Sequence, residues 1–192
     1  MRTDMFKTRN GYLTSLYPAG ILAAAVLIFF NGILLSDVKM TPEKMFTIKF
    51  PGSAIQKKPV YIKKEDRVVL EKKAGVTFTK GFFTFHEAKK EGRIIGYAFF
   101  DTHTVRTKEE TICVLFSPDG KITGVELISF YEPEEYAPSI RWLSQFVNKN
   151  DPENLRAGGN IAAMSGATLT TQSIVQTVRK ALVLYKYGFM EK

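Results

Sequence analysis

The stretch that decides the fold is FFTFHEAKKEGRIIGYAFF, residues 82–100. Two runs rich in aromatic and β-branched residues, 82–88 and 93–100, flank the dipeptide Glu91-Gly92. Such a dipeptide between apolar runs is typical of a tight hairpin turn, so the spacing predicts two antiparallel strands. Gly96, inside the second run, indicates a bulge.

The same pattern continues towards the C-terminus. Residues 111–116 and 122–130 are again apolar and β-branched, and Pro118-Asp119-Gly120 between them is a turn signal. Residues 104–110 are charged and are interpreted as a connection. Successive strands joined by tight turns predict an antiparallel sheet.

Two helices are predicted after the sheet. Residues 138–149 and 171–186 place apolar side chains at helical spacing, and Gly188 is expected to end the second helix. A meander followed by helices predicts an α+β domain, an antiparallel sheet with flanking helices, over residues 76–192.

Residues 38–75 are interpreted as a lysine-rich, membrane-proximal segment. Thr41-Pro42-Glu43 predicts a helix start, with a cap, a proline and an acidic first turn. Residues 60–62 and 68–70 are short strand candidates. The first would be an edge strand, because Pro59 precedes it.

An uncharged apolar stretch, LYPAGILAAAVLIFFNGILL, occupies residues 16–35. As a helix it would be about 30 Å long, which matches a bilayer core. We predict a short N-terminal segment over residues 1–15 and one transmembrane anchor over 16–37. A cleaved signal peptide is the competing interpretation, although no small-x-small cleavage site follows the apolar core. Three basic residues lie on each side, so charge does not fix the orientation.

Composition excludes several classes of protein. The chain has 192 residues, 45% apolar content and a net charge of +8, which is too apolar for a disordered chain. One cysteine, Cys113, excludes an internal disulfide and CxxC sites, and two histidines, His86 and His103, are too few for most metal sites, so we predict none. A basic module for lipid or nucleic acid remains an alternative, but the lysines are interleaved with acidic residues, which argues against nucleic acid.

The segment that carries chemistry is SGATLTT, residues 165–171, directly before the last predicted helix. The free N–H groups of a helix start and the helix dipole favour an anion, and Gly166 and Ala167 let a bulky ligand approach the backbone. An ordinary Ser/Thr cap explains the same residues, so both interpretations stay open at this point.

SGATLTT followed by an amphipathic helix resembles the flavin-attachment motif of the FMN-binding domain family. That family includes the G subunit of the Rnf complex and the C subunit of the sodium-translocating NADH:quinone oxidoreductase. GRIIGYAFFDT, PDGKITGVELISFYEPEEY and RWLSQF are similar to other family segments and occur in the expected order over roughly residues 76–188. The Rnf type usually has a Glu-Thr-Pro-Gly loop where this chain has Glu132-Pro133-Glu134-Glu135, which makes it an outlying member.

The resemblance implies that FMN is joined through its phosphate to Thr168. Hydroxyls and N–H groups near Thr168 can solvate that phosphate, so we expect it to be surrounded by Ser165, Gly166, Ala167, Leu169, Thr170 and Thr171. Candidates for contact with the flavin ring are Tyr131, Glu132, Tyr136 and Trp142. An electron relay needs no catalytic acid or base from the chain.

The implied function is a membrane-anchored, extracytoplasmic flavoprotein that relays electrons between redox partner proteins, either as a carrier or as a subunit of a membrane oxidoreductase complex. Maturation would require a flavin transferase outside the cytoplasm, which places the N-terminus inside and the domain outside. The family usually has an aspartate three positions before the motif serine, whereas this chain has Ala162. That difference favours the alternative, an anchored interaction domain that has lost flavin attachment.

Overall fold

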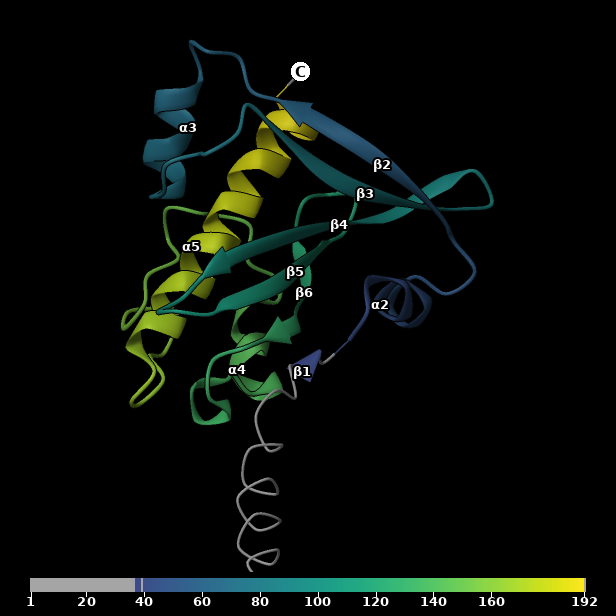
Figure 1. Ribbon diagram of the computed structural model, residues 1–192. Helices are drawn as coiled ribbons and strands as arrows, with labels where there is room; N and C mark the ends of the chain where they lie inside the picture. The colour runs from purple at the N-terminus through teal and green to yellow at the C-terminus, as the bar shows by residue number, and fades with distance from the viewer. Residues whose placement is uncertain (1–36, 39, 192) are drawn as a thin grey trace, which may run out of the picture. The chain divides into compact units, whose positions relative to one another are not determined.

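A six-stranded antiparallel sheet forms the centre of the computed structural model, which describes residues 37–38 and 40–191. The strand order is β1-β6-β5-β4-β3-β2, so consecutive strands from β2 to β6 are neighbours (Figure 1). The strands are β1 (Asp37–Val38), β2 (Ala54–Tyr61), β3 (Phe82–Lys90), β4 (Arg93–Thr104), β5 (Glu109–Phe116) and β6 (Ile122–Phe130). The helices are α2 (Pro42–Lys49), α3 (Arg67–Ala74), η1 (Glu134–Tyr136), α4 (Ile140–Leu143), η2 (Ser144–Phe146), α5 (Thr168–Tyr185) and η3 (Lys186–Met190).

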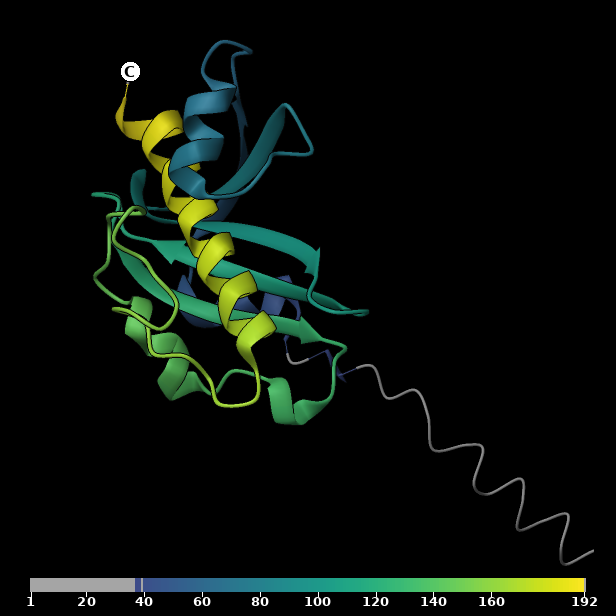
Figure 2. The same cartoon turned by 90° about the vertical axis from the view of Figure 1, so that its left-hand side faces the viewer.

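Helices cover both faces of the sheet. The long helix α5 crosses one face with α3 beside it, and α2 lies on the other face (Figures 1 and 2). The larger core lies under α5 and includes Phe85, Phe116 and Ile174, whereas Met45 of α2 and Cys113 belong to a smaller core on the opposite face. The α+β fold with an antiparallel sheet is therefore confirmed.

The hairpin of β3 and β4 forms as its sequence predicts. Glu91 and Gly92 both have positive φ, 51° and 76°, which suits a two-residue turn. The pairing register shifts between Ala88 and Lys89, opposite Gly96, so the predicted bulge is present. A Cβ on Gly96 would lie 2.6 Å from Cε1 of Phe50, which explains why a glycine is needed there.

The lysine-rich residues fold together with the sheet, because the described residues form a single compact unit. The predicted cap is confirmed, since the Thr41 hydroxyl accepts a hydrogen bond from the N–H of Lys44 at 3.3 Å. The predicted edge strand is also confirmed and is longer than expected: β2 lies at the end of the sheet and contains Pro59.

The strand predicted over residues 68–70 is wrong, because these residues belong to helix α3. Leu70 and Ala74, four residues apart, are buried, while Val68 is 72% exposed. That burial has helical rather than alternating spacing. Gly75 ends the helix in the left-handed conformation, with φ of 73°.

The helix predicted over residues 138–149 is shorter than expected. It consists of α4 and η2, which together end at Phe146. Asn148 then turns the chain with φ of 65° and donates to the carbonyl of Ile122 at 2.8 Å, so the chain leaves the helix to pair with the start of β6. Ile140, expected in the apolar stripe, is 87% exposed.

The last helix begins three residues earlier than predicted and does not stop at Gly188. Thr168 is its first residue, so Thr168, Leu169 and Thr170 lie inside the helix rather than before it. After Tyr185 the chain continues as the π-helical turn η3, which includes Gly188.

The predicted anchor and the residues before it, up to residue 36, lie outside the described residues. Within the part of the chain that the structure describes, no helix combines the length and the apolar character needed to span a bilayer.

Candidate functional site

The loop of Ser165, Gly166 and Ala167, called the motif loop from here on, leads directly into α5. Ser165, Gly166 and Thr168 are exposed, and Ala167 is buried. Gly166 has φ of 74°, and a Cβ placed on it would meet no atom within 4 Å. The positive φ favours glycine at this position, and the open space around it leaves room for a ligand against the backbone.

The start of α5 carries no side-chain cap. Its N-cap residue is Ala167, which has no side-chain acceptor for the first N–H groups of the helix. The N–H groups of a helix start carry a partial positive charge. The ordinary Ser/Thr cap, the other interpretation of the motif, is therefore not what these residues form.

The motif threonines separate into two kinds. Thr171 is buried, and its hydroxyl donates to the Ala167 carbonyl at 3.1 Å and accepts from the Met164 N–H at 3.0 Å. It therefore fixes the motif loop. Thr170 is also fully buried, and its hydroxyl has no hydrogen-bond partner among the described residues. Of these threonines, only Thr168 has an exposed side chain.

Glu132, a predicted neighbour of the flavin ring, lies next to the connection between β4 and β5. Its Oε1 accepts hydrogen bonds from the backbone N–H groups of Arg106, Thr107 and Lys108 at 3.1, 2.9 and 2.9 Å. Burial tends to raise the pKa of Glu132, but these three bonds and the Arg106 charge outweigh it and lower the pKa. Glu132 thus holds the connection in shape as a carboxylate.

The predicted aromatic residues differ in exposure. Trp142 is 9% exposed, and its Nε1 donates to the Ala162 carbonyl at 2.6 Å, which ties α4 to the segment before the motif loop. Tyr136 is half-buried and lies under the guanidinium of Arg106, 4.1 Å from ring centroid to Cζ. Tyr131 is 40% exposed.

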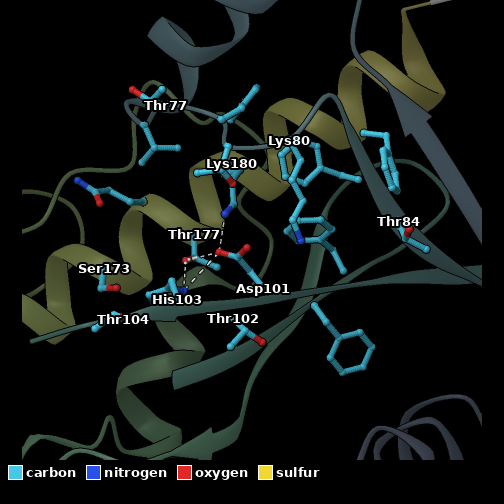
Figure 3. Close-up of a pocket in the computed structure, with 18 of the residues that line it drawn as sticks. Thr77, Lys80, Thr84, Asp101, Thr102, His103, Thr104, Ser173, Thr177 and Lys180 are labelled. Carbon is cyan, nitrogen blue, oxygen red and sulfur yellow. Dashed lines mark hydrogen bonds and ion pairs between the residues drawn. The ribbon is translucent and has the colours of Figure 1, made fainter. Parts of the chain in front are cut away.

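A cleft of about 680 Å³ opens beside α5 where two strands part (Figure 3). β3 and β4 pair only as far as Phe85 and Phe99. Beyond that pair, β3 follows β2 while β4 follows β5, so the sheet is split between them. The walls are mainly aromatic and hydroxyl-bearing, and they include Phe82, Phe83, Thr84, Phe100, Thr102, Thr104, Ser173, Gln176 and Lys180.

A charged network lies between α5 and the ends of β4 and β5. It consists of Asp101, His103, Glu110, Thr177 and Lys180 and is called the buried network below. His103 Nε2 lies 2.7 Å from Glu110 Oε1, and its Nδ1 lies 3.3 Å from Asp101 Oδ2. Lys180 Nζ lies 2.5 Å from the same Asp101 oxygen, and the Thr177 hydroxyl donates to that oxygen at 3.2 Å (Figure 3).

Two carboxylates therefore face two basic groups in this network. Burial alone would lower the pKa of His103, but its hydrogen bonds to Asp101 and Glu110, and their charges, raise it to about 9. The imidazole is consequently cationic at neutral pH. Burial alone would raise the pKa of Asp101, but the neighbouring His103 and Lys180 outweigh it and lower the pKa.

Stability is expected to fall between about pH 6.5 and 9.5. A histidine whose pKa is higher in the folded state than in the unfolded state stabilises the fold. This stabilisation is complete at a pH below the unfolded-state pKa and is lost as the pH rises through the folded-state pKa. For a pKa of about 9 the loss is at most about 3 kcal/mol. Urea unfolding at pH 6.5 and 9.5 measures it, with His103→Gln as the control. An equal fall in stability in that variant would show that His103 is not the cause.

Part of the chain that contains the motif loop matches a known protein family. Residues 108–183, from the β4–β5 connection through the motif loop to the last turn of α5, match the family described as FMN-binding domain. This match covers 76 of the 192 residues of the chain. The resemblance predicted from the motif is confirmed, and FMN is the cofactor that this family assigns to the domain.

Curated relatives belong to redox complexes. The G subunit of the ion-translocating oxidoreductase complex of Haemophilus influenzae strain PittEE is 31% identical over 134 residues, which cover 62% of this chain and 63% of the relative. Its counterpart in strain Rd is 30% identical over an equal length. The chain thus spans less than two thirds of these relatives. The crystal structure of Shewanella oneidensis NqrC aligns with a TM-score of 0.46 and 17% identity, over 77% of this chain and 71% of that one.

The motif loop offers groups that suit the phosphate of FMN, the cofactor named for the matched family. Thr168 offers an exposed hydroxyl, the uncapped start of α5 offers N–H groups for a phosphate, and Gly166 leaves open space. Ser165 and Leu169 are exposed beside them. Thr170 and Thr171, expected beside the phosphate, are instead buried.

Sequence patterns do not reveal two features of the site. They assign Arg106 to a charged connection over 104–110, but β4 and β5 extend further and leave only 105–108 between them. The same error hides the buried network. Asp101 and His103 are two positions apart in β4, so their side chains lie on the same face of the sheet. Glu110 of β5 pairs with His103 across the hairpin.

Proposed function

We propose that this protein is a membrane-anchored, extracytoplasmic electron carrier with FMN joined through its phosphate to Thr168 Oγ1. The observation that carries the proposal is the placement of Thr168. It is the exposed first residue of an uncapped helix, inside the span that matches the FMN-binding domain family. An ester at this hydroxyl leaves one negative charge beside the positive end of α5.

The residues around Thr168 have separate tasks in this proposal. Thr171 fixes the motif loop from below, and Gly166 keeps the approach open. The first N–H groups of α5 solvate the phosphodiester. When bound, FMN supplies reversible electron transfer, and the chain holds and orients it.

The relatives and the N-terminal sequence support the proposed partners and location. The relatives are named as subunits of ion-translocating oxidoreductase complexes. We therefore infer redox partners in a membrane complex. The apolar residues 16–35 would anchor the chain, with the N-terminus inside and the flavin domain outside. A flavin transferase would load the domain in that compartment.

The proposal is tested by the mass of the intact protein after coexpression with a flavin transferase. We expect a gain of one FMN less one water, together with a yellow protein whose colour survives denaturation. A colourless protein of unchanged mass, made beside a relative that does become loaded, would contradict covalent attachment.

The alternative is an interaction domain without flavin, and residue 162 discriminates between the two. The side chain of Ala162 is exposed, while its backbone N–H donates to Gln145 and its carbonyl accepts from Trp142. An aspartate can therefore be introduced without disturbing these bonds. If only Ala162→Asp gains the flavin mass, the natural chain has lost attachment and the alternative holds.

A further inference from the structure

The connection between β4 and β5 is a built turn rather than a free loop. The N–H of Val105 donates to the carbonyl of Lys108 at 3.0 Å, which closes the turn. Its next three N–H groups all donate to Glu132 Oε1, and Glu132 is only 8% exposed. A carboxylate that accepts three backbone bonds fixes the turn, and with it the direction in which the Arg106 side chain leaves the backbone.

Arg106 reaches from this turn to the motif loop. Its guanidinium stacks on the ring of Tyr136, with Cζ 4.1 Å from the ring centroid. Its Nη2 donates to the carbonyl of Gly166 at 3.4 Å. Two contacts from different segments thus hold an exposed arginine beside the residue that lies two positions before Thr168.

We propose that Arg106 is the positioning residue for the flavin-bearing threonine. It holds the motif loop through Gly166 and places a permanent positive charge at Gly166, two positions before Thr168. This inference rests on the proposed function, because it gives Arg106 a role in loading the same site. Glu132 and Tyr136, which the sequence offers as candidates for contact with the flavin ring, are assigned here the role of supporting Arg106.

The chemistry of the guanidinium suits this role. It carries five N–H donors in a rigid plane, and the contact with Gly166 uses one nitrogen at the edge of that plane. The remaining donors are available to a phosphate oxygen on Thr168. Full loading of Thr168 needs both the positive charge and the paired hydrogen-bond donors of the guanidinium. Lysine keeps the charge and should therefore retain part of the function, whereas glutamine should not.

The test is the rate of flavin loading, followed by intact mass during incubation with flavin transferase and its flavin donor. We expect Arg106→Gln to load about tenfold more slowly than the natural chain. Arg106→Lys should recover a substantial part of the rate. Lys108→Gln is the matched control, because Lys108 lies in the same turn and contributes only its backbone N–H to Glu132.

Two results would overturn the role of Arg106. One is loading of Arg106→Gln at the rate of Lys108→Gln. The other is loading of Arg106→Lys as slowly as Arg106→Gln. That result would show that the positive charge does not contribute to loading. Melting temperatures within about 3 °C of one another would show that the variants remain folded.

A measurement without flavin separates this inference from the proposed function. If the natural chain takes up no flavin, the proposed function fails, and amide hydrogen exchange of residues 163–170 then tests Arg106 by itself. We expect exchange of the Ala167 N–H, which donates to Met164, to be several-fold faster in Arg106→Gln and unchanged in Lys108→Gln. Equal exchange in both variants would overturn the positioning role.

Discussion

Replacing His103 with alanine is expected to lower the free energy of unfolding by about 3–5 kcal/mol. Glu110 is completely buried, and His103 is its hydrogen-bond partner at 2.7 Å, while its second oxygen already lacks one among the described residues. Removing the imidazole leaves a buried carboxylate without a cation, because Lys180 is engaged by Asp101. The cost of an unpaired buried charge exceeds that of the lost ring packing.

Urea unfolding at pH 7 measures this loss, with His86→Ala as the matched control. His86 lies in the neighbouring strand β3, and its ring contacts those of Phe46 and Phe100. Burial lowers its pKa, so its imidazole is neutral. We expect the control to lose much less, and the double variant His103→Leu with Glu110→Leu to recover most of the stability. A loss below about 1 kcal/mol in His103→Ala would contradict a cationic His103 in the network.

Replacing Thr168 with alanine is expected to abolish covalent flavin without changing the fold. The Thr168 side chain is exposed, and within the described residues its hydroxyl has no hydrogen-bond partner. Stability should therefore stay within about 0.5 kcal/mol of the natural chain. The measurement is in-gel flavin fluorescence after denaturation.

Gln172→Ala is the matched control for this variant, since Gln172 is exposed one turn further along α5. It should keep the full flavin content, and Thr168→Ser should keep part of it, because serine retains the hydroxyl. Covalent fluorescence of Thr168→Ala at the level of Gln172→Ala would exclude Thr168 as the attachment residue.

The sheet could be predicted from sequence because its signals are local. Aromatic and β-branched runs separated by Glu91-Gly92 and a second turn signal mark the strands, and each strand pairs with its neighbour in the chain. Helix α3 could not be predicted from local signals, because Val68 and Val69 favour a strand. Leu70 and Ala74 are buried where α3 packs against α5, and this packing stabilises the helix. Tertiary packing overrides local preference there.

The part of the candidate site that lies in one continuous segment could be proposed from the sequence. Thr168 and the residues beside it form a contiguous motif, so a phosphate site there could be proposed from the amino-acid sequence alone. Arg106 depends on three segments that meet only in the fold, the β4–β5 turn, Glu132 and Gly166. The pairing of His103 with Glu110 required the exact ends of β4 and β5, and strand ends are what sequence patterns fix least well.

The most direct test of the central claim is to map the flavin onto the tryptic peptide 157–179 of the chain loaded by flavin transferase. This peptide contains Ser165, Thr168, Thr170 and Thr171, and fragmentation distinguishes them. We predict that the mass of FMN less water appears on every C-terminal fragment that includes residue 168 and on none that begins at residue 169 or later. The same mass on Thr170 or Thr171, or a loaded protein whose flavin is released on denaturation, would contradict attachment at Thr168.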